Sequence, residues 1–270
     1  MGNWFIDTVR DVFKGERGER VLLGLGDRVP IMRPLTYRLT PQPYAYDPAA
    51  ERVVERHGLR FRLRPRHYFQ WHHFFKRDDP VLEELARAGA GKRVFIDVGA
   101  NVGLYALVVQ AVMAPDARVL AVEPARSTCA ALREHVAWSG RTGVEVYECA
   151  LSSSSGAAEL AERSDDWGKA SLSRTDSSTT VTQVSTKTLD ELVRDAKLTT
   201  IDLLKIDVEG HELDVLEGGK ESIEAHSPTI FVEFSPQWMT QQAVSELCDV
   251  LEALVARGYD CRRILPGGLV

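Results

Sequence analysis

The sequence predicts a doubly wound, mostly parallel α/β sheet with helices on both faces, a β-rich insertion and an N-terminal extension. From residue 93 onward, short apolar runs alternate with segments of helical periodicity, which is the pattern of parallel strands joined by crossover helices. A polar Ser/Thr-rich stretch interrupts this rhythm once. The length of 270 residues suits one sizeable domain with an extension, and the ordinary globular composition requires no metal or disulfide staples.

The first half of the sheet follows from three apolar runs and the segments between them. We expect strands at residues 94–98, 118–122 and 144–149, joined by helices at about 103–113 and 126–138. The polar segment 152–187 contains two strand-like pieces, 157–160 and 181–185, and so predicts a β-rich insertion instead of a linker.

The α/β rhythm then resumes. The pattern predicts a short helix at 189–196, buried strands at 201–206 and 229–234, a helix at about 242–257 and a final strand at 260–265. Parallel sheets of this kind bind ligands outside the carboxyl ends of their strands. We therefore expect the functional residues at four strand exits: 97–103, 123, 149–152 and 207–212.

Residues 1–90 lack this alternation of strands and helices. We therefore expect them to form an N-terminal extension to a domain at 91–270. Five prolines between residues 30 and 48 break any long element, so this part is expected to be partly loop, with a half-exposed strand at 59–63. The aromatic and histidine cluster at 68–75 is expected either to pack against the domain or to form a lid over an acceptor site. An amphipathic pattern at 4–13 favours packing on the domain or on a second subunit, hence a homodimer through the extension.

Composition excludes several classes of function. No apolar run approaches the ~20 residues that span a bilayer, and the start lacks a signal peptide, so we expect a cytoplasmic protein. The net charge of −6 disfavours general nucleic-acid binding. The four cysteines are scattered without metal-ligand spacing, so they are expected to be reduced thiols and no metal site is predicted.

The segment 97–103, with the sequence DVGANVG, indicates a nucleoside cofactor. Gly99 and Gly103 allow a sharp turn and a close approach to a ligand, and Glu123 ends the next strand where a ribose would lie. A dinucleotide fingerprint would place glycine where Asn101 stands, and Asp97 would repel a phosphate. Asp97 suits the ammonium and sulfonium of S-adenosylmethionine instead. The alternatives are a nicotinamide cofactor, or a turn with a purely structural role.

A second strand exit, residues 205–212 with the sequence KIDVEGHE, is crowded with charge. The strand before it is apolar, so these side chains are expected in the ligand crevice, where burial and like charge shift pKa values. Structural roles remain open: Lys205 pairing with a carboxylate, Glu212 capping the next helix, and Asp207 holding the turn. The catalytic candidates are Asp207, Glu209, His211, Lys205 and, at the neighbouring strand exit, Glu233.

Across residues 93–235 the chain resembles the FkbM family of S-adenosylmethionine-dependent methyltransferases, which have the Rossmann-like class I fold. The resemblance is carried in order by FIDVGANVG at 95–103, VEP at 122–124, ALS at 150–152, TLD at 188–190 and KIDVEGHE at 205–212. It implies O-methylation of hydroxyls on sugars, polyketides and related natural products. It also implies that Asp97, Gly99, Asn101 and Gly103 line the methionine end, that Glu123 binds the ribose, and that Ala150 and Leu151 contact the adenine.

One feature departs from this class, whose seven-stranded sheet usually ends in a strand hairpin. Only five residues follow position 265, so the last strand is expected to be missing or supplied by the extension.

The resemblance implies methyl transfer to a small hydroxylated acceptor with the help of a base. His211 has a suitable unperturbed pKa, whereas Asp207, Glu209 or Glu233 would need theirs raised. The acids could instead hold Mg²⁺, although Lys205 would compete for them. Two further alternatives are a cofactor-binding scaffold without catalysis and an N-methyltransferase. The absence of an Asn-Pro-Pro-Tyr-like turn favours oxygen over nitrogen.

Overall fold

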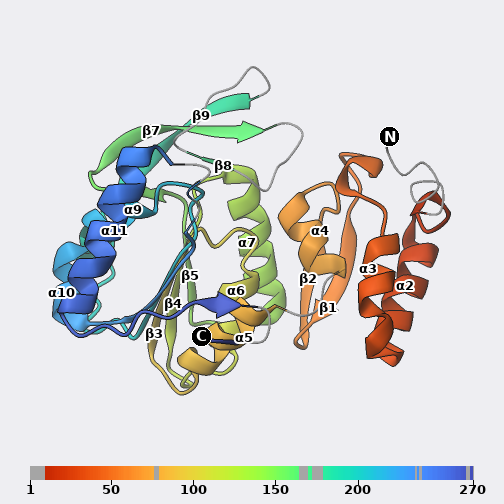
Figure 1. Cartoon of the computed structure of the whole chain (residues 1–270), viewed down its shortest axis with the longest axis horizontal. Coiled ribbons are helices and arrows are strands. Elements are labelled where there is room, and N and C mark those ends of the chain that lie inside the picture. Colours follow the sequence, from red (N-terminus) through yellow and green to blue (C-terminus); the bar gives the residue numbers. More distant parts are fainter. Residues whose placement is uncertain are drawn as a thin grey trace. The chain divides into compact units, whose positions relative to one another are not determined.

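The computed structural model describes residues 10–75, 79–163, 170–171, 179–234, 236, 239–265 and 268–269. Contacts divide the chain into two compact units (Figure 1). The first contains the chain up to Arg56 together with Arg60–Asp79, and the second contains His57–Leu59 and nearly all of the chain from Pro80 onward. The sequence placed this division near residue 90. The structure assigns helix α5 (Pro80–Gly89) to the second unit, where it packs against helix α6.

The second unit is built on a parallel sheet of five strands in the order β11-β10-β3-β4-β5. The strands are β3 (Val94–Val98), β4 (Arg118–Val122), β5 (Val144–Tyr147), β10 (Leu203–Ile206) and β11 (Thr229–Val232). Every residue of β3 and β10 is buried, as expected for central strands covered on both faces. The order reverses between β3 and β10, which is the switch point where such sheets bind ligands.

Helices cover both faces of this sheet, which confirms the predicted fold class. Figure 1 shows α5, α6 and α7 on one side and α9, α10 and α11 on the other. Their bounds are α6 (Leu104–Gln110), α7 (Arg126–Ser139), α8 (Leu189–Asp195), α9 (Glu212–Glu217), α10 (Lys220–His226) and α11 (Gln241–Ala256). Helix α8 begins with a capping box, in which Thr188 accepts the amide of Glu191 and the Glu191 side chain reaches back. One side of the sheet packs Ile96, Leu120 and Leu204 against Leu192 and Leu216.

The predicted β-rich insertion is confirmed as a second sheet, with the order β6-β9-β7-β8. Its strands are β6 (Ala150–Leu151), β7 (Gly156–Arg163), β8 (Ala170–Ser171) and β9 (Thr179–Lys187). Strands β7 and β9 form a long antiparallel pair, whereas β6 runs parallel to β9. Because β6 follows β5 almost directly, the insertion begins where β5 leaves the main sheet.

The predicted last strand at 260–265 is wrong in length and in partner. Only β12 (Ile264–Leu265) is extended, and it pairs antiparallel with β13 (Gly268–Leu269) outside the main sheet. The reason is chemical: Asp260 and Arg262 are exposed and pair with each other, so this run cannot lie in a buried sheet. Among the described residues the main sheet therefore has five strands.

The first unit is more regular than the sequence suggested. It contains α2 (Glu16–Arg28), η1 (Pro30–Met32), α3 (Arg33–Leu39), η2 (Pro43–Ala45), β1 (Arg52–Arg56), β2 (Leu59–Leu63) and α4 (Tyr68–Phe75). Pro30, Pro34 and Pro43 sit in the first turns of their helices, where the missing amide costs nothing. The prolines thus start short helices instead of forming loop. The predicted strand at 59–63 is confirmed as β2, paired with β1.

The aromatic cluster at 68–75 is helix α4, and it packs inside the first unit. Trp71, Phe74 and Phe75 are buried, and the Trp71 indole donates a hydrogen bond to the Pro41 carbonyl at 2.7 Å. A role as a lid stays a prediction. Most of the amphipathic pattern at 4–13 lies outside the described residues. None of the helices within the described ranges has the length and apolar character needed to cross a membrane.

Candidate active site

The turn after β3 depends on its two glycines. Gly99 has φ of 76°, and a Cβ there would lie 1.9 Å from the Asp207 carbonyl oxygen. Gly103 has φ of 84°, and a Cβ there would lie 2.2 Å from Leu132 Cδ1 on helix α7. The backbone conformation is strained for larger residues at both positions, and at Gly99 the neighbouring backbone also leaves no space for a Cβ. In these two contacts the close approach is made to the protein's own chain, and an approach to a ligand stays a prediction.

Glu123 joins the exits of β3 and β4. Its carboxylate accepts the backbone amides of Asn101 and Ala125, each at 2.9 Å, and the side chain is buried. Asn101 is itself held in a left-handed conformation, with its side-chain oxygen accepting the amide of Val102. A carboxylate has further acceptor capacity beyond two hydrogen bonds, so ribose binding by Glu123 stays a prediction that this geometry permits.

Asp97 and Lys205 form a buried ion pair beneath the turn. They are direct partners in the β3–β10 register, so their side chains lie on the same face of the sheet. Lys205 Nζ lies 3.1 Å from Asp97 Oδ1 and 3.3 Å from Asp207 Oδ2. The same ammonium donates to the Gly99 carbonyl at 3.3 Å and lies 5.1 Å from the centre of the Tyr105 ring. The pairing of Lys205 with a carboxylate is thereby confirmed.

The charges of this group are strongly coupled. Burial alone would lower the pKa of Lys205, but the carboxylates of Asp207 and Asp97 outweigh it and raise that pKa, so Lys205 stays an ammonium. Burial raises the pKa of Asp97, and the Lys205 ammonium opposes that rise. One cation is thus shared between two carboxylates. The local excess of negative charge favours a cationic ligand.

Glu233 completes this carboxylate group from β11. Its backbone amide donates to the Ile206 carbonyl at 2.9 Å, which places it beside the exit of β10. A hydrogen bond with Asp207, followed by burial and by the charges of Asp207 and Glu209, raises the pKa of Glu233 to about 9. This shift favours the protonated form of Glu233, whose side chain is exposed. Glu209 itself has φ of 51°, a left-handed conformation that is uncommon outside glycine.

His211 belongs to a second group, made with Ser152, which the sequence marked only as part of a strand exit, and with Asp214, which sequence reasoning missed. Its Nε2 lies 3.0 Å from Ser152 Oγ, and its Nδ1 lies 3.1 Å from Asp214 Oδ2. Burial lowers the pKa of His211, which keeps the ring neutral at pH 7. With Nδ1–H donated to Asp214, Nε2 is free to accept the Ser152 hydroxyl. Asp214 also accepts a hydrogen bond from Ser153 Oγ at 3.0 Å.

The loop between these groups is shaped by Glu212. This residue is fully buried at the start of α9, and its Oε1 accepts the Gly210 amide at 3.0 Å. Burial raises the pKa of this carboxyl, while backbone hydrogen bonds oppose the rise. Glu212 therefore stabilises the loop that carries Glu209 and His211, instead of capping helix α9 as the structural alternative expected.

The structure brings Asp97, Lys205, Asp207 and Glu233 into one group, and His211 into another with Ser152 and Asp214. Ala150 and Leu151 are buried in β6, next to Ser152, and their contact with adenine stays a prediction. Asp214 was detectable from its position three residues after His211. Ser152 was marked only as part of a strand exit, because its partner lies 59 residues away. Among the described residues, no group of three or more His, Cys, Asp or Glu is arranged to hold a metal ion.

The fold and these strand exits define a nucleoside-cofactor-binding α/β protein of the methyltransferase class. Residues 97–261 match the Methyltransferase FkbM domain, which is more than half of the chain, so the chain belongs to this family. The resemblance predicted from the sequence is therefore confirmed. Membership of a methyltransferase family also supports S-adenosylmethionine as the cofactor of this site.

Two relatives with the word methyltransferase in their names share this part of the chain. Methyltransferase sdnD of Sordaria araneosa is 31% identical over 47% of this chain and 60% of its own length. Methyltransferase 1 of Beauveria bassiana is 27% identical over 46% of this chain and 57% of its own length. The matches thus span less than two thirds of these relatives.

Among solved structures, the O-methyltransferase TomG of Streptomyces achromogenes, involved in tomaymycin synthesis, is 14% identical. That match covers 74% of this chain and 82% of TomG, with a TM-score of 0.42. A similarity of this size carries no argument about the function of this chain.

Proposed function

We propose that this protein transfers the methyl group of S-adenosylmethionine to a hydroxyl of a small natural product, such as a sugar or polyketide. The observation that carries the proposal is the carboxylate-rich group at the switch point of the sheet. There, one buried Lys205 is shared between Asp97 and Asp207, with Glu233 beside them. A phosphate would be repelled by this group, whereas a cofactor with an ammonium and a sulfonium would be attracted.

The cofactor would be held by the turn and by two strand exits. In this proposal Asp97, Gly99, Asn101 and Gly103 line the methionine end. Glu123, already aligned by the amides of Asn101 and Ala125, accepts the ribose hydroxyls. Ala150 and Leu151 provide an apolar surface for the adenine. When bound, the cofactor supplies a methyl group already activated by the positive sulfur.

The protein's own contribution is positioning and proton removal. Holding an acceptor oxygen in line with the carbon–sulfur bond is worth roughly 7 to 11 kcal/mol in well-oriented reactions. The base in this proposal is His211, because its ring is neutral and is oriented by Asp214. The acceptor proton would pass through the Ser152 hydroxyl to His211 Nε2, while the cofactor would supply the methyl group to the acceptor oxygen and leave as the neutral thioether.

The carboxylates are alternatives for the base, and their surroundings support His211 over them in this proposal. The raised pKa of Glu233 favours its protonated form, which disfavours it as the base in this proposal. Asp207 is paired with Lys205, which makes it a weak base. Glu209 stands in a strained conformation on the same loop and remains the second candidate.

Calorimetric titration with S-adenosylmethionine and S-adenosylhomocysteine tests the cofactor site. We expect the wild type to bind both, and we expect Glu123→Ala and Asp97→Ala each to weaken binding by an order of magnitude or more. Glu224→Ala is the matched control, because Glu224 makes only a surface ion pair on α10. Absence of binding to either ligand in the wild type would overturn the proposal.

Turnover separates the remaining functions once binding is established. A non-catalytic scaffold would bind the cofactor without transferring its methyl group. Matched pairs of acceptors that differ only in a hydroxyl or an amino group distinguish O-methylation from N-methylation. We propose a small-molecule acceptor instead of a nucleic acid because the net charge is −6.

Location and assembly are further parts of the proposal. The four cysteines are free thiols, which supports a reducing, cytoplasmic location. We also propose that the N-terminal unit serves acceptor recognition or self-association as a homodimer. Sedimentation analysis of the purified chain over a range of concentrations tests the second of these roles.

A further inference from the structure

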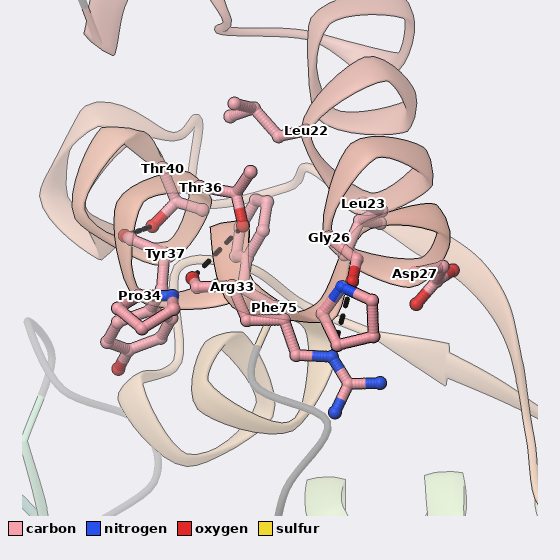
Figure 2. A pocket seen from close by; sticks show the side chains of 11 residues that line it. Leu22, Leu23, Gly26, Asp27, Arg33, Pro34, Thr36, Tyr37, Thr40 and Phe75 are labelled. Atoms are coloured by element: carbon pink, nitrogen blue, oxygen red, sulfur yellow. Dashed lines mark hydrogen bonds between the residues drawn. The ribbon is translucent and has the colours of Figure 1, made fainter.

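The first unit contains a cavity of its own, with a volume of about 310 Å³ (Figure 2). It lies between helices α2 and α3, is partly open to solvent, and is also lined by Thr40 and Phe75. All of the residues that line it belong to the first unit. The cavity can therefore be considered without reference to the second unit. Nothing in the proposed methyl transfer accounts for it.

The volume of the cavity suits a small organic ligand. Ligand sites start at about 300 Å³, and an apolar cavity of about 150 Å³ holds one benzene ring. A volume of 310 Å³ thus corresponds to two fused rings. The inner wall fits the rings of such a ligand, because the side chains of Leu22 and Phe75 are buried and apolar. Pro30 and Pro34 lie on the side of the cavity that faces solvent.

The cavity is held open by contacts between α2 and α3. Arg33 Nε donates to the Gly26 carbonyl at 3.2 Å, which fixes the end of α2 against the start of α3. Gly26 allows this approach, since a Cβ there would lie 3.1 Å from Thr36 Oγ1. The two helices are thus braced by hydrogen bonding and by close packing. A preformed cavity of this kind saves the ligand the cost of ordering the site.

The polar lining of the cavity consists of the charged side chains of Asp27 and Arg33 and of three hydroxyl groups. Thr36 Oγ1 donates to the Arg33 carbonyl at 3.1 Å, and Thr40 Oγ1 donates to the Tyr37 carbonyl at 2.7 Å. Each threonine has thereby used its proton and offers a ligand only acceptor lone pairs. The Tyr37 hydroxyl contacts His72 Nδ1 at 3.2 Å, and burial raises the pKa of Tyr37 to about 12, so it stays neutral. A ligand that donates a hydrogen bond matches this wall.

We propose that this cavity binds a compact, two-ring apolar molecule that carries a hydroxyl group. The apolar side chains take the rings, and the oxygen atoms of Thr36 and Thr40 accept the hydroxyl proton. This chemistry agrees with the hydroxylated acceptor suggested above. Only that link to the acceptor rests on the proposed function, because binding in the cavity requires neither the cofactor nor the second unit's site.

The test uses 1-naphthol as the probe and 1-methoxynaphthalene as its matched control. The two share the ring system, but only 1-naphthol donates a hydrogen bond. Titrations of the full chain are followed by ligand-observed NMR and calorimetry. We expect 1-naphthol to bind about 3- to 10-fold more tightly, which is the range that one hydrogen bond supplies. Equal affinities, or no binding of either compound, would overturn the proposal.

Variants then locate the binding. Leu23→Trp fills the cavity from α2 and should abolish binding of both compounds. Val21→Trp is the matched control, because Val21 is 61% exposed on the same helix and does not line the cavity. Thr36→Val and Thr40→Val should remove the preference for 1-naphthol while leaving the ring to bind. Thermal melts show whether each variant is folded.

S-adenosylmethionine titrations on the same samples separate this proposal from the methyltransferase proposal. Probe binding that survives Leu23→Trp refutes the cavity assignment even where cofactor binding is intact. Conversely, a chain that binds 1-naphthol but no cofactor refutes the proposed function and leaves the cavity assignment standing.

Discussion

At the scale of single residues, the site is governed by a shortage of positive charge. Lys205 is the ammonium between Asp97 and Asp207, and the proton on Glu233 relieves the remaining repulsion. A cation that enters such a group takes over part of that neutralising role. Binding of a cationic cofactor should therefore displace a proton, and this makes the charge arrangement measurable.

We predict that S-adenosylmethionine binding releases a proton from Glu233. Its pKa is about 9 in the free protein, and a bound cation lowers it. Affinity should therefore rise with pH through the neutral range and level off near pH 9, because proton release favours binding wherever the free protein holds more protons than the complex. Calorimetry in buffers of different ionisation enthalpy counts the protons released. Glu233→Gln should bind without this pH dependence, and an unchanged dependence in that variant would refute the assignment.

We predict that His211→Ala lowers turnover by about 10²- to 10⁴-fold, the usual contribution of a general base. The dissociation constant for S-adenosylmethionine should change little, because His211 contacts Ser152 and Asp214 instead of the turn. His226→Ala, at the end of α10, is the control. Unchanged turnover in His211→Ala would move the role to Glu209, for which Glu209→Gln is the corresponding variant.

Asp214 acts through His211, so its variant should differ in kind. Asp214→Asn removes the carboxylate beside Nδ1 and should lower kcat by an order of magnitude or more, with KM nearly constant. Because the His211 imidazolium loses its partner charge, the acid limb of the pH–rate profile should move to lower pH. A loss of activity with an unmoved profile would indicate a structural role only.

At the scale of elements, the turn between β3 and α6 is fixed by contacts with two other segments. Gly99 touches the backbone of the loop after β10, and Gly103 touches a side chain of α7. The difference matters, because backbone cannot move aside whereas the end of the Leu132 side chain can. The turn is therefore more tightly constrained at its first glycine than at its last.

We predict the order of destabilisation Gly99→Ala, then Gly103→Ala, then Gly140→Ala. All three positions have positive φ, so each variant loses about 1 to 2 kcal/mol to backbone conformation. Gly140 has open space around its Cβ and should show only that loss. Overpacking adds about 1 to 3 kcal/mol at Gly99. Urea denaturation measures all three, and equal values for Gly99→Ala and Gly140→Ala would contradict the described packing.

At the scale of the whole molecule, the sequence was sufficient for the second unit and weak for the first. Strands such as 94–98 and 118–122 were predictable to the residue, because buried parallel strands are continuous apolar runs bounded by turns. In the first unit, prolines at 30, 34 and 43 predicted that no long element forms, which is correct, but not that short helices form. Since a proline breaks a helix only beyond its first turn, those residues instead begin helices.

The same contrast applies to the site. The acids at 205–212 and the turn at 97–103 are local patterns and could be found by inspection. Ser152 could not be assigned as a partner of His211, because that pairing depends on how the insertion returns to the main sheet. The cavity of the first unit was likewise beyond prediction, since it arises from the angle between two helices that the sequence did not indicate.

The thiols provide a test of the whole fold. Cys248 and Cys261 are exposed, whereas Cys129 and Cys149 are buried, and burial raises the pKa of each buried thiol to about 11. We predict that a thiol reagent at neutral pH labels the two exposed cysteines rapidly and the two buried ones only on unfolding. Mass spectrometry of the labelled peptides checks this. Rapid labelling of Cys129 would contradict the packing of α7 on the sheet.

The carboxylate of Glu123 has a spectroscopic consequence. Because it accepts the amides of Asn101 and Ala125, those two N–H groups are in direct contact with the side chain proposed to receive the ribose. Any ligand that draws electron density from that carboxylate must alter both amide resonances together. In a ¹H–¹⁵N spectrum the pair forms a built-in reporter of nucleoside occupancy, and its exchange with deuterium would show how firmly the empty site is already organised.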